Sequence, residues 1–382
     1  MSAQEPEKLS IKRLLMVMVK QDASDLYIAS GLAPAYRIKG AVIPLKQPPL
    51  NAVQTEQLAN ATMTEKQRAV FAEEMEMNLA VAYEGMGRFR VNIFRQRGDV
   101  GMVIRKITTD VPTAEQLDLP PVMLEVIMAK RGLVLMVGAT SSGKSTSMAA
   151  LLDYRNSNQQ GHIITIEDPI EFVHKHKKCV ITQREVGTDT VSFKAALKNT
   201  LRQAPDVILV GEIRDRETME HALEFAETGH LCVGTLHANN ANQTLERILN
   251  FFPEETHSQI RLNMALNLKA VISQRLVKTV DDGRKAAIEI LVNTPRIADL
   301  IEKWSVGEIK EAMEAGEKYG MQSFDQHLLR LWREGFISEE TALVNSDAMN
   351  DLRLKIKMAK LESSDSDGMD QLDAMGDNEL RI

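Results

Sequence analysis

The most informative segment of this chain of 382 residues reads Leu133-Val-Leu-Met-Val137-Gly138-Ala-Thr-Ser-Ser-Gly143-Lys144-Ser145-Thr146. An apolar run precedes two glycines, and the second glycine is followed at once by lysine, serine and threonine. This order predicts a buried strand, a glycine-rich loop and the first turn of a helix, and it matches the eight-position pattern of a phosphate-binding loop. A turn without a ligand is the alternative, but it gives no reason for the sequence Lys-Ser-Thr.

The residue types of this loop indicate its chemistry. Glycines allow backbone N–H groups to face a phosphate, and the helix N-terminus adds a partial positive charge. We expect Lys144 to reach the terminal phosphates and the Ser145 hydroxyl to ligate magnesium. The predicted nucleotide-binding residues are Gly138, Ala139, Thr140, Ser141, Ser142, Gly143, Lys144, Ser145 and Thr146.

Strand-like apolar runs recur in this part of the chain, with helical patterns between them. Strands are predicted at Leu133–Val137, His162–Ile166, Val207–Val210 and Leu231–Leu236. Helices are predicted at Lys144–Tyr154, Ser192–Arg202, Arg216–Glu227 and Asn242–Phe251. Strand, helix and strand at this spacing predict an α/β domain, whose parallel sheet is covered on both faces.

Two of the predicted strands lead into carboxylates at their C-terminal ends, where ligands of open α/β sheets bind. The strand that ends at Val210 is followed by Gly211 and Glu212, and we expect Glu212 to hold magnesium or its water. A strand of this kind usually ends in aspartate. The strand that ends at Ile166 leads into Glu167-Asp168-Pro169-Ile170-Glu171. One of these three acids is predicted to orient and deprotonate the attacking water.

A third strand has a histidine at each end, in Thr228-Gly229-His230-Leu-Cys-Val-Gly-Thr235-Leu-His237. Residues seven apart in a strand point to opposite faces. Only one of the two is therefore expected to touch a γ-phosphate. His237 is favoured, and His230 is the other candidate.

The remaining chain falls into three further parts. Residues 1–108 mix short alternating strands with helical stretches such as Thr55–Met77, which predicts a small α+β domain. A linker is expected at residues 109–120, because Pro120-Pro121 bars continuation of a helix. An ATPase domain is expected at residues 121–350, with a helical pattern after about residue 255. Residues 351–382 form a charged tail, in which Ser363–Ile382 is expected to be disordered.

Composition argues against several classes of protein. The formal net charge of −7 and the pI of about 5.7 disfavour nucleic acid as a partner. Cys179 and Cys232 belong to no paired-cysteine motif, which suggests neither a disulfide framework nor a zinc site. The longest apolar runs fall well short of the roughly 20 residues that cross a bilayer. We therefore expect a cytoplasmic protein.

Together these motifs resemble the type II/type IV secretion ATPase superfamily, and within it the retraction ATPases of type IV pili, PilT and PilU. The resemblance covers residues 10 to about 345 and includes Ala23-Ser-Asp-Leu26, Gly31 to Gly40 and Gly87-Arg-Phe-Arg-Val-Asn92. It implies a RecA-like P-loop ATPase core preceded by a small PAS-like domain. It also implies ATP and Mg²⁺ as cofactors, and a hexameric ring with ATP at the subunit interfaces.

The resemblance implies roles for individual residues as well. By motif position Glu167 resembles the family's catalytic base, and Glu212 resembles its magnesium-side glutamate. Arg88, Arg90 and Arg105 lie where the family's arginine fingers occur. An arginine supplied by a neighbouring subunit stabilises the charge on the transferred phosphoryl group. The alternative is that these arginines form only the solvated face of a sheet.

Two departures from the family pattern refine the resemblance. Assembly ATPases carry a four-cysteine zinc site that this chain lacks, which favours retraction. In Arg296-Ile-Ala298-Asp-Leu-Ile301, alanine stands where the main retraction ATPases have arginine. Together with the acidic tail, this change favours the accessory type, PilU. The implied partners are a main retraction ATPase of the PilT type and the pilus platform protein of the inner membrane, with the chain peripheral to that membrane at the pilus base.

Three functions follow from these patterns. The first is a mechanochemical ATPase that powers pilus retraction and twitching motility. The second is a coupling subunit that binds ATP but acts mainly through a partner ring. The third is a nucleic-acid translocase, which the acidic pI disfavours. A zinc site at His174, His176 and Cys179 is disfavoured by too few and poorly placed ligands, and the basic stretch Leu352–Lys360 is assigned no function.

Overall fold

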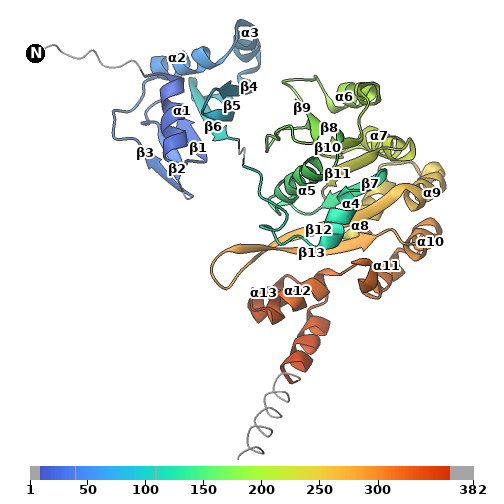
Figure 1. Cartoon of the computed structure of the whole chain (residues 1–382). Helices are drawn as coiled ribbons and strands as arrows, with labels where there is room; N and C mark the ends of the chain where they lie inside the picture. Colours follow the sequence, from blue (N-terminus) through green and yellow to red (C-terminus); the bar gives the residue numbers. More distant parts are fainter. Residues whose placement is uncertain (1–8, 39, 108–109, 362–382) are drawn as a thin grey trace, which may run out of the picture. The chain divides into compact units, whose positions relative to one another are not determined.

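The computed structural model describes residues 9–38, 40–107 and 110–361, and the tail predicted to be disordered, Ser363–Ile382, lies outside them. The chain divides into two compact units (Figure 1). The first unit contains residues 1–111, 166–175 and 183–196, and the second contains residues 112–165, 176–182 and 197–382. The domain boundaries expected from the sequence, at residues 108 and 121, stay a prediction.

The first unit is built on an antiparallel sheet of six strands in the order β3-β2-β1-β6-β5-β4. These strands are β1 (Asp25–Ile28), β2 (Ala35–Ile38), β3 (Ala41–Pro44), β4 (Glu76–Tyr83), β5 (Gly87–Gln96) and β6 (Asp99–Lys106). Alternation along β5 buries Phe89, Val91 and Ile93 in a core that also contains residues of α1 (Ile11–Lys20) and α2 (Ala52–Thr62). The α+β character predicted for this region is confirmed.

The single helical stretch predicted at Thr55–Met77 is wrong, because the chain forms two helices and the start of a strand there. Helix α2 ends at Thr62, and α3 (Glu65–Glu74) begins after Thr64. The Thr64 side chain accepts a hydrogen bond from the Gln67 N–H, and the Gln67 side chain accepts one from the Thr64 N–H. This capping box fixes a new helix start. Met75 then takes a left-handed φ of 62°, and β4 begins at the next residue.

The second sheet has seven strands in the order β13-β12-β7-β11-β10-β8-β9. They are β7 (Gly132–Val137), β8 (Gly161–Glu167), β9 (Cys179–Glu185), β10 (Val207–Val210), β11 (Leu231–Leu236), β12 (Leu268–Lys278) and β13 (Arg284–Val292). Strands β10, β11, β7 and β12 pair in parallel. The predicted α/β fold with a parallel sheet is confirmed.

Ten α-helices named here accompany this sheet in the described residues. They are α4 (Pro121–Ile127), α5 (Lys144–Asn158), α6 (Phe193–Thr200), α7 (Arg216–Glu227), α8 (Ala241–Asn250), α9 (His257–Asn267), α10 (Pro295–Lys303), α11 (Ile309–Glu314), α12 (Phe324–Arg333) and α13 (Glu339–Val344). Residues 349–361 form one more helix. Within the described ranges, none of these helices has the length and apolar character that crossing a membrane requires.

The helical pattern expected after residue 255 is wrong for two strands, β12 and β13, and β9 was also not predicted. In β12 the polar run Ser273-Gln274-Arg275 interrupts the apolar residues, so the sequence lacks a clear strand signal. Pairing with β7 on one side and with β13 on the other nevertheless holds this segment extended. Tertiary context has overridden local propensity, as is common for strands.

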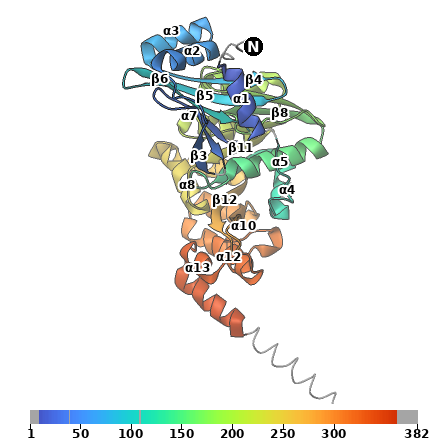
Figure 2. The same cartoon turned by 90° about the vertical axis from the view of Figure 1, so that its left-hand side faces the viewer.

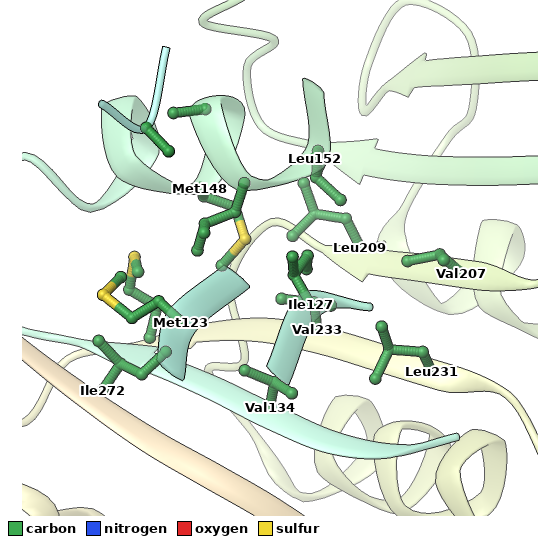
Figure 3. Packing of buried hydrophobic residues seen from close by; sticks show 14 of the residues in the cluster. Met123, Ile127, Val134, Met148, Leu152, Val207, Leu209, Leu231, Val233 and Ile272 are labelled. Carbon is green, nitrogen blue, oxygen red and sulfur yellow. The ribbon is translucent and has the colours of Figure 1, made fainter. Parts of the chain in front are cut away.

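Apolar side chains of α4 and α5 cover one face of the second sheet (Figure 3). Met123 and Ile127 of α4 and Met148 of α5 pack in one cluster with side chains from β7, β10, β11 and β12. Each fully buried side chain of this size contributes roughly 1.5–3 kcal/mol. This packing fixes α5, whose first residue follows the glycine-rich loop, against the sheet.

The C-terminal helices gather at one end of the second unit, as the two views in Figures 1 and 2 agree. Phe324 and Leu328 of α12 share a buried cluster with Leu352 and Ile356 of the helix at residues 349–361. Leu352 and Ile356, two buried residues of this last helix, are four positions apart, which is helical spacing. Residues 351–361 are therefore a docked helix, although the sequence placed them in a charged tail.

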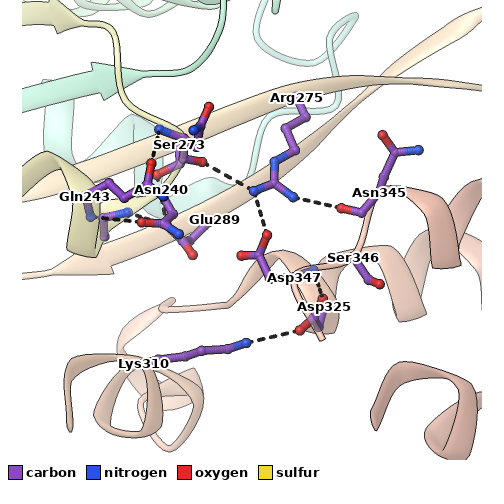
Figure 4. A network of polar contacts seen from close by, with 12 residues as sticks. Asn240, Gln243, Ser273, Arg275, Glu289, Lys310, Asp325, Asn345, Ser346 and Asp347 are labelled. Carbon is purple, nitrogen blue, oxygen red and sulfur yellow. Dashed lines mark hydrogen bonds and ion pairs between the residues drawn. The ribbon is translucent and has the colours of Figure 1, made fainter. Parts of the chain in front are cut away.

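A polar network connects β12 and β13 with these C-terminal helices (Figure 4). The Arg275 guanidinium contacts the Asp347 carboxylate at 2.6 Å and donates to the Asn345 carbonyl oxygen at 2.8 Å. Beside it, Glu289 is 3% exposed and accepts hydrogen bonds from the Ala241 N–H at 2.7 Å and the Ser273 hydroxyl at 2.9 Å. Burial raises the pKa of Glu289 to about 7.

We predict that Glu289→Gln flattens the pH dependence of stability. Because folding raises the pKa of Glu289 from 4.5 to about 7, the folded chain binds the proton more tightly, and stability falls as pH rises across this interval. The free energy of unfolding falls by at most about 3 kcal/mol over this interval. Urea unfolding of the wild type and the variant between pH 5 and 7.5 measures it. The exposed Glu334→Gln is the control, and an equally steep decline in Glu289→Gln would contradict the prediction.

Candidate functional site

The glycine-rich loop joins β7 to α5, as the sequence predicts, and two of its glycines have backbone angles that favour glycine. Gly138 has a φ of 149° and Gly143, which precedes the helix, has a φ of 86°. A Cβ atom on Gly138 would lie 2.4 Å from the Gln274 carbonyl oxygen, and one on Gly143 would lie 2.7 Å from Gln274 Nε2. Both glycines are therefore required by a close approach of β12 as well as by backbone conformation.

Lys144 folds over the first residues of the loop. Its Nζ donates hydrogen bonds to the carbonyl oxygens of Gly138 and Ala139, both at 2.8 Å. The ammonium group thus lies at the mouth of the loop, beside the N-terminus of α5. A positive charge at that place, together with the helix dipole, favours a bound anion.

Glu212 follows the short strand β10 and is fixed through the neighbouring strand. The Thr235 hydroxyl of β11 donates to the Gly211 carbonyl oxygen, and the Ile213 N–H donates to the Thr235 carbonyl oxygen at 2.8 Å. Glu212 contacts the Arg214 guanidinium at 2.6 Å and His237 Nε2 at 3.3 Å.

The charges around Glu212 keep its carboxyl group ionised. Partial burial alone would raise its pKa, but the hydrogen bond and charge of Arg214 outweigh burial. The charges of His237 and Lys144 act in the same direction, and the net result is a pKa below the usual range. An ionised carboxylate is the form that a hard divalent cation binds.

The two histidines lie at opposite ends of β11. His237 follows its last residue and contacts Glu212. His230 precedes its first residue, and its carbonyl oxygen accepts a hydrogen bond from the N–H of Gly132, where β7 begins. The six residues between them span about 20 Å. The structure therefore brings His237, and not His230, to the end of the sheet where the glycine-rich loop begins.

A pocket of about 250 Å³ joins the glycine-rich loop to the segment around His237. It is lined by Gly138, Ala139, His237, Ala238, Asn239, Gln243 and Arg247. A second pocket, of about 520 Å³, borders the loop at Gly143 and Thr146, with Ser147, Gln274 and Leu276 among its lining residues. The loop is therefore accessible at both of its ends.

Glu167 is the last residue of β8 and belongs to the first unit. Its Oε1 accepts a hydrogen bond from Gln183 Nε2 at 3.2 Å, and its carbonyl oxygen accepts one from the Val186 N–H at 2.9 Å. Strand β9, which was not predicted, thus holds the side chain of the predicted base through Gln183, and the residue that follows this strand, Val186, holds its backbone.

The three predicted arginines share the first unit but have different surroundings. Arg88 contacts Glu185 at 3.3 Å. Arg105 pairs in register with Arg90 on β5, and its Nε donates to the buried carboxylate of Asp25 at 2.8 Å. Asp25, from the quoted Ala23-Ser-Asp-Leu26, is thus a residue whose contact with an arginine the sequence did not predict.

Gln274 is the main residue at the glycine-rich loop that sequence reasoning missed. It is 2% exposed, its Nε2 donates to the Ser142 carbonyl oxygen at 2.8 Å, and its Oε1 accepts from the Ser147 hydroxyl at 2.9 Å. The available signal was an amide side chain within the polar run Ser273-Gln274-Arg275, which apolar residues flank. This signal can be interpreted only when the segment is already known to be a strand that pairs with β7.

The histidines and cysteine near β9 are used within the fold. His176 Nδ1 accepts a hydrogen bond from the Ile181 N–H at 3.0 Å, and the Cys179 thiol donates to the Gln159 carbonyl oxygen at 3.0 Å. In the part of the chain that the structure describes, no three or more His, Cys, Asp or Glu side chains gather in an arrangement suited to a metal ion. A magnesium ion held mainly by phosphates needs only one or two protein ligands, and the Ser145 hydroxyl and the ionised Glu212 have the right chemistry.

Comparison with known proteins agrees with this site. Residues 2–333 match the family described as type II/IV secretion system protein. The chain is 53% identical over 365 residues to the type IV pilus ATPase PilU of Pseudomonas aeruginosa, covering 95% of each protein. It is 45% identical over 334 residues to the type IV pilus retraction ATPase PilT of the same organism, covering 87% of this chain and 97% of that protein.

A solved structure extends this similarity to three dimensions. The crystal structure of the pilus retraction motor PilT with bound ADP has a TM-score of 0.85 at 40% identity, covering 91% of this chain and 99% of that chain. The family match over residues 2–333 includes both the glycine-rich loop and the His237 segment. The chain therefore belongs to the type II/IV secretion ATPase family, in its PilT/PilU branch.

Proposed function

We propose that this chain hydrolyses ATP to ADP and phosphate, and that the reaction powers retraction of type IV pili as an accessory motor of the PilU type. The observation that carries the proposal is the pocket in which the first residues of the glycine-rich loop meet His237, whose imidazole contacts the ionised Glu212. Family membership and the similarity to an ADP-bound motor support the same function.

In the proposed reaction, the loop N–H groups and Lys144 hold the β- and γ-phosphates. Lys144 exchanges its contacts with the Gly138 and Ala139 carbonyl oxygens for contacts with phosphate oxygens. Such positioning and charge neutralisation account for most of phosphoryl-transfer catalysis. Ser145 and Glu212 would hold magnesium or its water, and the bound ion would neutralise negative charge on the phosphates.

Glu167 is proposed to accept the proton of the attacking water. The water oxygen bonds to the γ-phosphorus while the bond from that phosphorus to the bridging oxygen breaks, and ADP leaves. His237 is proposed to contact the γ-phosphate, and its contact with Glu212 at 3.3 Å supports this role. We do not extend this role to His230, which lies at the other end of β11.

The assembly proposed for this motor follows from the family. We propose a hexameric ring in which Arg88, Arg90 or Arg105 of one subunit reaches the phosphates of its neighbour. The proposed location is the cytoplasmic side of the inner membrane at the pilus base, next to the platform protein. The proposed ring acts alongside a main retraction ATPase of the PilT type, and no role is proposed for nucleic acid or zinc.

The alternative function is that of a coupling subunit, and one residue favours it. Ala298 lies on α10, at the position where the family resemblance implies an arginine in the main retraction ATPases. In this alternative the chain binds ATP, hydrolyses it only weakly by itself and transmits force through its partner. The two functions therefore differ in how much ATP the chain hydrolyses without the partner.

We predict that Lys144→Ala and Glu167→Gln abolish steady-state phosphate release by different routes. Lys144→Ala should weaken ATP binding and lower kcat/KM by at least about 100-fold. Glu167→Gln should retain ADP affinity and lower kcat by about 100-fold or more. A phosphate-release assay with titrations of labelled ADP measures both quantities, with the exposed Lys318→Ala as control. Wild-type turnover in either site variant would refute this assignment of the site.

We also predict that the purified wild-type chain releases phosphate without any partner. Its Glu212 contacts His237 at 3.3 Å, and the charge of Lys144 helps to lower the pKa of the same carboxyl group, all within one chain. ATPase activity is measured with and without a PilT-type ATPase whose own phosphate-loop lysine is replaced. Activity only in the mixture would contradict an autonomous motor and favour the coupling subunit.

A further inference from the structure

The side chain of Gln274 occupies the space between β12 and the glycine-rich loop. Strand β12 runs parallel to β7, with Ile272 opposite Met136 and Ser273 opposite Val137. Gln274 is therefore the next residue along, beside Gly138, where β7 gives way to the loop. Its amide is enclosed, because the residue is only 2% exposed.

Both ends of this amide bind the loop and the helix that follows it. Nε2 donates to the Ser142 carbonyl oxygen at 2.8 Å, just before Gly143. Oε1 accepts from the hydroxyl of Ser147, a buried residue in the first turn of α5, at 2.9 Å. Gln274 thus connects two points that flank Lys144 and Ser145.

The hydrogen bond to Ser142 also sets the direction of a backbone N–H group. In a trans peptide the C=O and the following N–H lie in one plane and point in opposite directions. Because the Ser142 carbonyl points to Gln274, the Gly143 N–H points away from β12. An N–H group at this place in the loop is one of those expected to hold a phosphate oxygen.

Glycine at residue 143 is what allows this contact. A Cβ atom there would lie 2.7 Å from Gln274 Nε2, so a side chain would displace the amide. Without the amide, the Ser142 carbonyl and the Ser147 hydroxyl would be buried without this partner, which is costly. The missing side chain of Gly143 therefore leaves the space that the Gln274 amide occupies.

We propose that Gln274 is a positioning residue for the nucleotide site: it presets the 142–143 peptide and the first turn of α5 so that the loop N–H groups face phosphate before nucleotide binds. The proposal rests on the proposed nucleotide-binding function. It adds a residue from a distant part of the sequence to the phosphate-binding machinery. Gln274 itself does not touch the nucleotide.

The test uses the full-length chain and Mg-ADP as the probe. Gln274→Leu has nearly the same volume but can neither donate to Ser142 nor accept from Ser147. We expect it to weaken ADP binding roughly tenfold. We expect the KM for ATP to rise by a similar factor, while kcat changes by less than about threefold, because the loop contacts persist through the reaction. Ser147→Ala removes one of the two contacts and should weaken binding about threefold.

A matched control separates positioning from general destabilisation. Gln322 donates through Nε2 to the Ile288 carbonyl oxygen at 2.8 Å and lines neither pocket beside the loop. Gln322→Leu should lower the unfolding midpoint as Gln274→Leu does, yet leave the ADP affinity unchanged. Equal losses of ADP affinity in the two variants would overturn the proposal.

The remaining outcomes distinguish this proposal from the proposed function. If Lys144→Ala loses ADP while Gln274→Leu binds it within twofold of the wild type, the positioning role is wrong and the site stands. If Lys144→Ala binds ADP as the wild type does, the nucleotide site itself is wrong. Should Gln274→Leu fail to fold, Ser147→Ala decides, and unchanged ADP affinity in that variant overturns the positioning role.

Discussion

The close approach of β12 to the glycine-rich loop is the constraint on which the site depends. A Cβ atom on residue 138 would lie only 2.4 Å from the Gln274 carbonyl oxygen, so only glycine fits at this position. The side chain of the same glutamine then fills the space beside Gly143. A strand from late in the sequence thus shapes a loop from its middle. The positions of Lys144 and Ser145 follow, because both residues begin the helix that this contact fixes.

A second set of contacts places the acid and the histidine. The bonds between Thr235 and the backbone of residues 211 and 213 fix the segment that bears Glu212 against β11. The same strand ends immediately before His237, which contacts that acid. Strand β11 therefore fixes the positions of Glu212 and His237 relative to each other and to the pocket beside Gly138. The charges that surround Glu212 keep it ionised, which is the state that a cation requires.

Much of this fold could be predicted from the sequence, because the decisive elements combine two independent signals. The strand before Gly138 is apolar throughout, and the glycine, lysine and hydroxyl residues that follow have no other common explanation. The helix at Arg216–Glu227 and the strand at Val207–Val210 were predicted with the bounds that the structure has. In each case the signal was local.

The elements that were missed depend on distant partners. Strand β12 carries Ser, Gln and Arg in its middle, and only its neighbours β7 and β13 make it a strand. The role of Gln274 was invisible for the same reason, because its partners lie about 130 residues earlier. The break at Thr64 is different, since its capping box with Gln67 was present in the sequence and was overlooked. The docked helix at residues 351–361 was hidden by its many charged side chains.

We propose that the N–H groups of residues 139–146 hold the phosphates of a nucleotide, and amide hydrogen exchange of the full-length chain with and without saturating Mg-ADP can detect this contact. We expect exchange at least about tenfold slower in this loop when ADP is present, because direct hydrogen bonds and a closed loop both protect the amides. Unchanged exchange across the loop at saturating nucleotide would contradict it.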